Sequence, residues 1–172
     1  MGYIVRIFKK TIRCIIRYIW TSIVKRRCGS FKGKVTANYR TQVTKNTFLG
    51  NNVNFNGLTI NGNGKVIIGD NFHSGPECLL ITQNHNFDSG TAIPYDKTYI
   101  LKDITIADNV WLGSRVIVLG GVTIGEGAII QAGSCVVNDI PAYAIAGGHP
   151  ARVFKKRNIK HYETLKADKK FT

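Results

Sequence analysis

The sequence predicts an all-β solenoid, a parallel β-helix built from six-residue units, with a basic amphipathic helix before it and a short helix after it. Three observations carry this prediction. An apolar residue recurs at every sixth position through seven consecutive units, small turn-forming residues lie between these positions, and the excess positive charge lies in the N-terminal part of the chain. With 172 residues, 44% of them hydrophobic, the chain is long enough for one folded domain with its own core.

The first segment, residues 1–30, is predicted to be the basic amphipathic helix. Lysine and arginine recur at steps of three or four from Arg6 to Arg17, which places them on one helix face, while Ile, Phe and Trp occupy a wide opposite face. A signal peptide is excluded because Arg17 interrupts the apolar run and no small-residue cleavage site follows.

Residues 1–27 suit two different environments. A helix of this kind can lie in the headgroup region of an anionic membrane, with its cations attracted to lipid and its apolar side chains partly inserted. Alternatively, the apolar face packs against the protein's own body or another subunit. Nucleic acid is not an expected partner, because the segment lacks a groove-reading motif and is dense in isoleucine.

Charge and cysteine content indicate the compartment. The net charge is +14, and the first 69 residues contain 13 Lys or Arg and no acid, Asp70 being the first. No apolar stretch is long enough to cross a bilayer. The four cysteines, from Cys14 to Cys135, are spaced too widely for a CxxC pair or a disulfide framework. We expect a cytoplasmic protein, with a peripheral position at the inner face of the membrane if residues 1–27 bind lipid.

Residues 31–153 are predicted to form the solenoid. Every sixth residue from Ile100 to Val136 is Ile, Leu or Val, although these types make up only 43 of the 172 residues. The residue two positions before each later anchor is apolar or small, so each unit is a short strand with two inward side chains. Gly, Asn and Asp between the strands favour sharp corners. The seven anchors are Ile100, Ile106, Leu112, Val118, Ile124, Ile130 and Val136.

The same period continues upstream with interruptions. The step from Leu49 to Ile68 holds one residue more than three units, and the step from Leu80 to Ile100 holds two more. We therefore expect two extra residues to bulge from the coil within 85–99. Loops that break a strict solenoid are where function is usually placed.

The run 104–156 contains NVWLG, GVTIGEGAIIQAGS, DIP and GGHPARV in that order. It closely resembles the hexapeptide-repeat acyltransferases, in particular the branch of galactoside, maltose and capsular-polysaccharide O-acetyltransferases. With the upstream repeat and Asn84-His85, the resemblance covers about residues 49–157. It implies a left-handed parallel β-helix that assembles as a homotrimer, with acetyl-CoA and the acceptor meeting in the cleft between neighbouring subunits.

The resemblance also implies residues for the acetyl donor, acetyl-CoA, with no metal. Ser114 and Ala132 match positions that contact the pantetheine arm, and Trp111 matches the tryptophan beside the thioester. Alternatively, Trp111 is a packing residue at the trimer interface without a direct cofactor role. Arg152 and Lys155 match the two basic positions near the adenosine phosphates, where arginine would bind by a bidentate fork and lysine as a point charge.

His85 matches the family's catalytic histidine. Its own position agrees, because an outward imidazole at the start of a loop can take a proton from a sugar hydroxyl near neutral pH. Asp88 either orients His85 through the second ring nitrogen or is a solvated turn residue. Asn84 is predicted to bind substrate, and the N–H of Gly113 to stabilise the oxyanion.

The C-terminal segment, residues 154–172, is predicted to be a helix and tail, with the helix over 154–168. The acceptor side departs from the family pattern, since Asn63 stands where galactoside-type enzymes have a sugar-binding carboxylate and Phe55 where they have an asparagine. We therefore predict an acetyl-CoA-dependent O-acetyltransferase acting on a sugar hydroxyl of a surface polysaccharide or lipid-linked glycan.

Several alternatives stay open at the level of the sequence. An N-acetyltransferase of an amino sugar and an antibiotic acetyltransferase resemble the same fold. A zinc carbonic anhydrase-like β-helix would need three converging histidines. Two of the four histidines here, His149 and His161, lie at or beyond the last coil. A catalytically silent β-helix is the remaining alternative.

Overall fold

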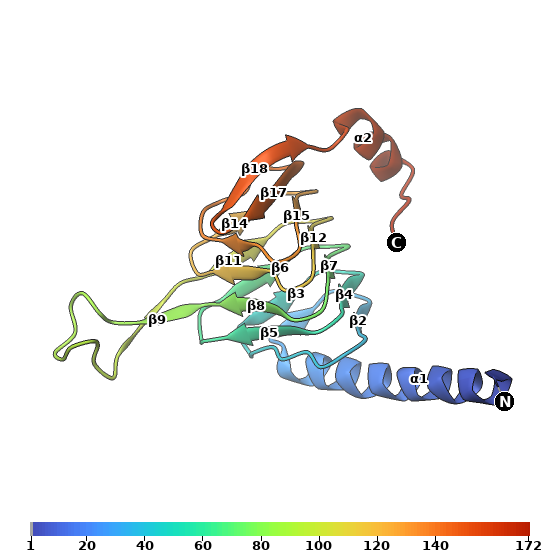
Figure 1. The fold of residues 1–172 in the computed structure, drawn as a ribbon, viewed down its shortest axis with the longest axis horizontal. Helices are drawn as coiled ribbons and strands as arrows, with labels where there is room; N and C mark the ends of the chain where they lie inside the picture. The colour runs from blue at the N-terminus through green and yellow to red at the C-terminus, as the bar shows by residue number, and fades with distance from the viewer. Residues whose placement is uncertain (1) are drawn as a thin grey trace.

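The computed structural model describes residues 2–172, and the side chains from residue 5 onward. Met1, the first residue of the predicted segment 1–30, lies outside the described residues. The chain folds into a parallel β-solenoid with α1 (Gly2–Arg27) beneath it and α2 (Ile159–Ala167) at its upper end (Figure 1). The predicted fold class is confirmed.

Three sheets form the walls of the solenoid, and each of the middle coils contributes one strand to each wall. All pairs within them are parallel except β17–β18. The five-stranded sheet contains, in spatial order, β1 (Ser30–Phe31), β3 (Thr47–Leu49), β6 (Val66–Ile68), β11 (Ile104–Ile106) and β14 (Thr123–Ile124). The four-stranded sheet contains β16 (Cys135–Val136), β13 (Ile117–Leu119), β8 (Cys78–Ile81) and β5 (Leu58–Asn61). The seven-stranded sheet contains β18 (Ala151–Lys156), β17 (Ala144–Gly148), β15 (Ile129–Ile130), β12 (Trp111–Leu112), β7 (His73–Ser74), β4 (Val53–Phe55) and β2 (Val35–Ala37).

The six-residue repeat forms the core. The six anchors from Ile106 to Val136 are fully buried, and the residues two positions before them are buried as well. Successive coils stack in register, so that Ile106 pairs with Ile124, three repeat units later. A short strand with alternating burial thus contributes two side chains to the core from each wall.

Stacked polar side chains hold one corner of the coil. Asn52, Asn71 and Asn109 all have positive φ, between 55° and 59°, a conformation that asparagine tolerates better than most residues. The side-chain amide of Asn52 donates to Asn71 (3.0 Å), and that of Asn71 donates to Asn109 (3.0 Å). The Asn positions between anchors therefore form the sharp corners that the sequence predicted.

The first predicted anchor, Ile100, is not in the core. It lies 38% exposed in β10 (Tyr99–Leu101), which pairs antiparallel with β9 (Gln83–His85) in a hairpin that projects from the solenoid (Figure 1). Leu80 pairs with Val118, 38 residues later, where a coil of three repeat units holds 18. The insertion is therefore a full 20 residues, and the predicted bulge of two is wrong. Because the insertion is close to one coil in length, an apolar residue of β10 falls at a spacing that fits the six-residue repeat, although it is not part of the core.

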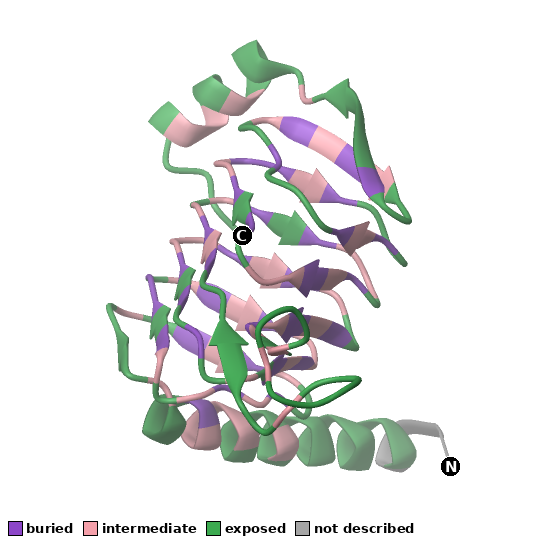
Figure 2. Cartoon of the chain, turned by 90° about the vertical axis from the view of Figure 1, so that its left-hand side faces the viewer, coloured by how far each residue is buried: buried purple, intermediate pink, exposed green. Residues whose placement is uncertain are grey.

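The two ends of α1 have different surroundings. Near its C-terminal end Val24 is fully buried and Trp20 packs against the core, while Thr21 Oγ1 accepts a hydrogen bond from the Ala37 N–H (2.9 Å). The rest of α1 is mostly exposed (Figure 2). Packing on the protein's own body thus applies to the last turns only. Neither helix, within the part of the chain that is described, has a stretch long and apolar enough to span a bilayer.

The C-terminal helix is shorter than predicted. Residues 154–156 belong to β18, which extends antiparallel along the edge of β17, and α2 begins only after Asn158. The Asn158 side chain accepts from the His161 N–H (3.0 Å) and so caps the helix. Residues 154–156 therefore form a strand along the edge of β17, although their sequence pattern favours a helix.

Candidate functional site

The hairpin β9–β10 holds the predicted base. His85 pairs with Tyr99 across the two strands, and its ring stacks on Tyr95 with centroids 3.7 Å apart and planes 16° apart. The Tyr99 ring lies 4.6 Å away on a tilted plane. Nδ1 of His85 is buried and has no hydrogen-bond partner among the described residues. Such an atom is uncommon in native proteins and requires a specific explanation.

Asp88 does not pair with His85 in this structure. It is exposed on the loop after β9, and no hydrogen bond joins the two side chains among the described residues. The predicted orienting role of Asp88 therefore has no contact to support it within one chain. Asn84, the predicted substrate residue, is exposed in β9 and lies opposite Ile100.

A different carboxylate organises the hairpin loop. Asp96 Oδ1 accepts hydrogen bonds from the Thr98 hydroxyl (2.5 Å) and N–H (2.8 Å), and Oδ2 accepts from the Thr91 N–H (3.0 Å). These hydrogen bonds from Thr98 and Thr91 lower the pKa of Asp96 to about 2. Asp96, Tyr95 and Tyr99 were not predicted as site residues, although all three lie in the segment that interrupts the repeat.

The predicted donor-binding residues lie on neighbouring strands of the seven-stranded sheet. Trp111 in β12 is half exposed and pairs with Ile129, Ile129 pairs with Ile145, and Ile145 pairs with Lys155 of β18. This row connects two predicted positions, Trp111 and Lys155, through two intervening strands. Arg152 is also exposed on β18, opposite Gly147.

The corner beside this row is closely stacked. A Cβ atom on Gly113 would lie 2.5 Å from the Ala132 nitrogen, so only glycine fits there. The Ser114 carbonyl accepts from the Gly133 N–H (2.8 Å), which joins the two corners that contain the predicted positions Ser114 and Ala132. The structure therefore brings Trp111, Gly113, Ser114 and Ala132 together on adjacent coils.

The N–H of Gly113, the predicted oxyanion donor, already has a partner in this structure. It donates to the Ile130 carbonyl (2.8 Å) as part of the stacking between coils. The parallel register between coils thus uses the donor that the predicted oxyanion role requires.

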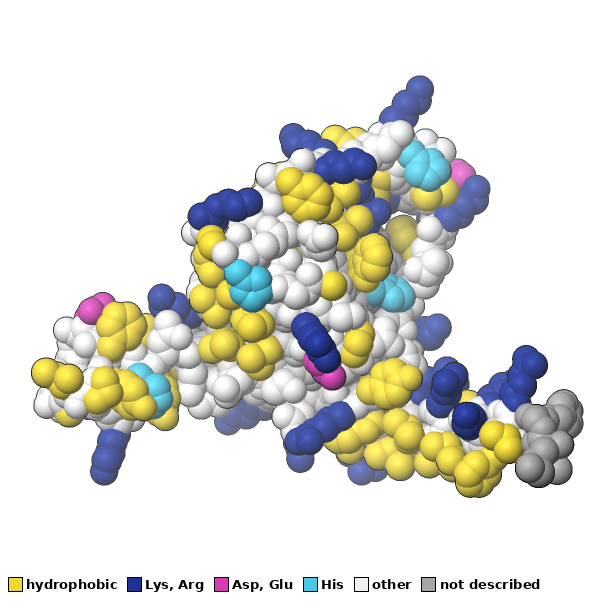
Figure 3. Space-filling model, viewed as in Figure 1, with side chains coloured by type: hydrophobic (Ala, Val, Ile, Leu, Met, Phe, Trp, Pro, Cys, Tyr) yellow, Lys and Arg dark blue, Asp and Glu magenta, His cyan; other side chains and the backbone are white. Residues whose placement is uncertain are grey.

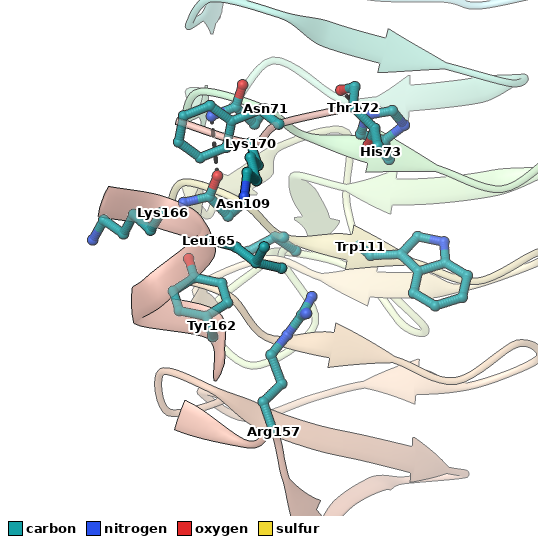
Figure 4. Close-up of a pocket in the computed structure, with 12 residues that line it drawn as sticks. Asn71, His73, Asn109, Trp111, Arg157, Tyr162, Leu165, Lys166, Lys170 and Thr172 are labelled. Carbon is teal, nitrogen blue, oxygen red and sulfur yellow. Dashed lines mark hydrogen bonds between the residues drawn. The ribbon is translucent and has the colours of Figure 1, made fainter. Parts of the chain in front are cut away.

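A pocket of about 350 Å³ lies between α2 and the seven-stranded sheet (Figure 4). Trp111 lines it from β12, Arg157 from the position directly after β18, and Tyr162 and Lys166 from α2. Lys166 is paired with Glu126 (2.5 Å), so much of the positive charge of this pocket is already compensated. No ion pair involves Arg152 or Lys155 among the residues described.

Hydrogen bonds to Glu126 determine how α2 is held. Glu126 Oε1 accepts from the Tyr162 hydroxyl (3.0 Å) as well as from Lys166. Burial raises the pKa of Glu126, but the hydrogen bonds from Lys166 and Tyr162 outweigh it and the pKa lies below its usual value. Burial and the Glu126 carboxylate raise the pKa of Tyr162. The Arg157 guanidinium donates to the Gly127 carbonyl (2.6 Å) and lies 5.3 Å from the Tyr162 ring.

The two halves of the predicted site are apart within one chain. His85, Asn84 and Asp88 lie on the projecting hairpin, whereas the donor-side residues lie on the seven-stranded sheet (Figure 1). The described part of the chain contains no group of three or more His, Cys, Asp or Glu that could hold a metal ion.

The family model for the bacterial transferase hexapeptide, with six repeats, matches residues 103–138. The galactoside O-acetyltransferase of Escherichia coli strain K12 is 40% identical over 121 residues, which cover 68% of this chain and 58% of that protein. The chain spans between 43% and 60% of the length of three further curated relatives.

Solved structures give the same relationship. The maltose O-acetyltransferase from Clostridium difficile 630 is 31% identical, with a TM-score of 0.65 over 78% of this chain and 73% of its own. A galactoside acetyltransferase crystallised in complex with coenzyme A is 30% identical, with a TM-score of 0.64 over 82% of this chain and 71% of its own. Both similarities cover most of the solenoid chain.

Proposed function

Since the chain belongs to the hexapeptide-repeat acetyltransferases, we propose that it is an acetyl-CoA-dependent O-acetyltransferase acting on a sugar hydroxyl. The observation that carries this proposal is the half-buried, stacked His85 on a hairpin that interrupts the repeat, together with the row from Trp111 to Lys155 on the sheet. The names of the E. coli and C. difficile relatives support a sugar acceptor. A polysaccharide or lipid-linked glycan is the acceptor we propose.

His85 acts as the general base in the proposed reaction. Its imidazole takes the proton of the sugar hydroxyl as that oxygen attacks the thioester carbonyl carbon of acetyl-CoA. The tetrahedral adduct then collapses, the carbon–sulfur bond breaks, and the imidazolium returns the proton to the departing thiolate. The products are the O-acetyl sugar and coenzyme A.

Acetyl-CoA is proposed to lie along the corner that contains Ser114 and Ala132. Trp111 faces outward beside this corner and offers an aromatic surface near the thioester end. Arg152 and Lys155, exposed on β18, would receive the adenosine phosphates. The galactoside acetyltransferase in complex with coenzyme A supports this donor.

We propose that the active unit is a homotrimer whose site lies between subunits. Leu79, Ile117 and Cys135 are aligned on the outer face of the four-stranded sheet, with Ile81 two residues further along β8 and Val137 directly after β16. This apolar strip lies beside the start of the hairpin, which follows β8. A neighbour seated on the strip would place its donor-side sheet within reach of the hairpin's His85.

The activity test compares His85→Ala with the parent. Loss of a general base typically lowers the rate by about 10² to 10⁴-fold. Thiol release from acetyl-CoA would be measured with a galactoside and with maltose as soluble acceptors. His161→Ala on α2 is the matched control and should retain full activity. A His85→Ala rate within about threefold of the parent would contradict the assignment.

A melting experiment separates the proposal from a catalytically silent solenoid. Acetyl-CoA should raise the melting temperature of both the parent and His85→Ala, because the donor row is intact in each. Absence of any shift in the parent would contradict acetyl-CoA as the donor. Metal content of the purified protein, measured in parallel, tests the zinc alternative. The cytoplasmic location stays a prediction.

A further inference from the structure

The unpartnered face of α1 is an apolar stripe. Phe8, Ile12, Ile15 and Ile19 follow one another at steps of three and four, which aligns them on one side of the helix. Phe8 is 65% exposed, Ile15 53% and Ile19 47%. An exposed stripe of large apolar side chains over three turns is an interaction surface rather than an ordinary solvated face.

The opposite side of α1 faces the solenoid. Val24, at its C-terminal end, is fully buried, and Arg17 and Arg13 precede it at helical spacing on the same side. A cavity of about 440 Å³ separates these arginines from Asn38 and Asn56 of the lowest coils. The apolar stripe must therefore point away from the solenoid, and Figure 3 shows hydrophobic side chains gathered along the underside of α1.

The direction of the stripe restricts what can cover it. A subunit packed beside the solenoid lies on the same side of α1 as the solenoid itself, where the basic residues are. Such a neighbour leaves the underside exposed. A second copy approaching from below would bring its own basic segment, because residues 1–69 contain 13 Lys or Arg and no acid. Repulsion between these like charges therefore opposes the packing of two copies through the undersides of α1.

From these observations we propose that α1 docks the protein on an anionic lipid surface. Phe8, Ile12, Ile15 and Ile19 insert at the boundary between headgroups and acyl chains, and the cations of α1 are attracted to the headgroup charge. In the proposed homotrimer, with its axis along the solenoid, the undersides of the three α1 helices point in the same direction. All three then bind one lipid surface together, which rests on the proposed function. Docking itself does not depend on the proposed activity.

Co-sedimentation with vesicles tests the docking. The full chain should bind vesicles of phosphatidylglycerol and phosphatidylcholine at low salt and should bind phosphatidylcholine alone at least about tenfold more weakly. Salt near 0.5 M should weaken the binding to the anionic vesicles, because screening shortens the range of the charges. Equal binding to both vesicle types, or none to the anionic ones, would overturn the proposal.

Matched variants test the stripe. Phe8→Ser combined with Ile15→Ser and Ile19→Ser should lower binding to anionic vesicles by at least about tenfold, while leucine at the same three positions should retain it. These side chains are exposed, so the melting temperature should be the same in both variants. Unchanged binding by the serine variant would overturn the inserted stripe. If the parent had twice the solution mass of the serine variant, two copies would be packing through the undersides of α1. That result would overturn lipid docking.

Discussion

At the scale of single residues, the side chain of His85 is held by aromatic contacts. Tyr95 stacks on one face of the imidazole and Tyr99 lies against it at an angle, while Nδ1 lacks a hydrogen-bond partner among the described residues. Stacking restricts the ring plane without choosing a tautomer. The orientation of His85 therefore depends on how the loop places Tyr95, next to Asp96.

Asp96→Asn is expected to lower the rate through the position of His85. The neutral amide cannot accept the hydrogen bonds from Thr91 and Thr98 on both of its atoms, so the loop loosens and the rate falls by about tenfold. Unfolding temperature should hardly change, because the site is exposed. Steady-state kinetics with a soluble acceptor measure the effect.

Asp88→Asn on the same loop is the comparison for that variant. Asp88 has no hydrogen bond to His85 in the described structure, and its substitution should leave the rate within about twofold of the parent. A larger loss in Asp88→Asn than in Asp96→Asn would instead assign the orienting role to Asp88.

The pH dependence of the loop follows from the lowered pKa of Asp96. A depressed pKa means that the carboxylate stabilises the folded loop above the usual value near 3.8, and that this contribution is lost as the pH falls towards about 2. The loop should thus keep its hydrogen bonds at neutral pH.

At the scale of elements, α2 is held on the solenoid by Glu126. Its carboxylate accepts from Tyr162 and Lys166 of the helix, and the Tyr143 hydroxyl donates to Glu163 (2.9 Å). No residue of α2 is buried, so these polar contacts and the Tyr143–Tyr162 edge contact do most of the docking.

Glu126→Gln is expected to release α2 while the solenoid stays folded. Amide exchange over residues 159–167 should become faster, whereas the main unfolding transition should shift little because no α2 side chain is buried. Since the pKa of Glu126 is lowered, its contribution is present above the usual value of 4.5 and is lost as the pH falls below it. The parent at low pH should then resemble the variant.

Asp168→Asn is the control for this release. Asp168 forms an ion pair with Lys170 (3.0 Å) at the end of the helix, and no ion pair joins it to another of the described residues. Its substitution should leave exchange over 159–167 unchanged. Equal exchange in the parent and in Glu126→Gln would contradict the proposed docking.

At the scale of the whole molecule, the sequence predicts the periodic coils well and the inserted hairpin poorly. Stacked coils require an inward side chain at each sixth position, so the positions from Ile106 to Val136 could be read directly. Ile100 could not be distinguished, because β10 is apolar for reasons unrelated to the core. The partners of His85 were missed for the same reason, since contacts within an inserted loop leave no period in the sequence.

Mixed trimers test the site between subunits. His85→Ala and Ala132→Glu should each be inactive alone, one lacking the base and the other blocking the donor corner. Co-expressed at equal levels, they should recover about a quarter of the parent activity, because a site needs an intact hairpin from one subunit and an intact corner from its neighbour. Activity of the purified mixture, with its mass verified, measures this.

A mixture with no recovered activity would place both halves of the site within one chain. Mixing the two variants after separate purification, without exchange of subunits, is the control and should give no recovery.

The ends of the solenoid bear on solubility. A stack of parallel strands exposes unpaired backbone groups at both poles, where a further strand from any other molecule could add. Here α1 lies against β2 at one pole, and β18 runs antiparallel along β17 at the other. The two terminal segments thus cover the seven-stranded sheet at both poles, which disfavours the addition of a further strand from another molecule to that wall.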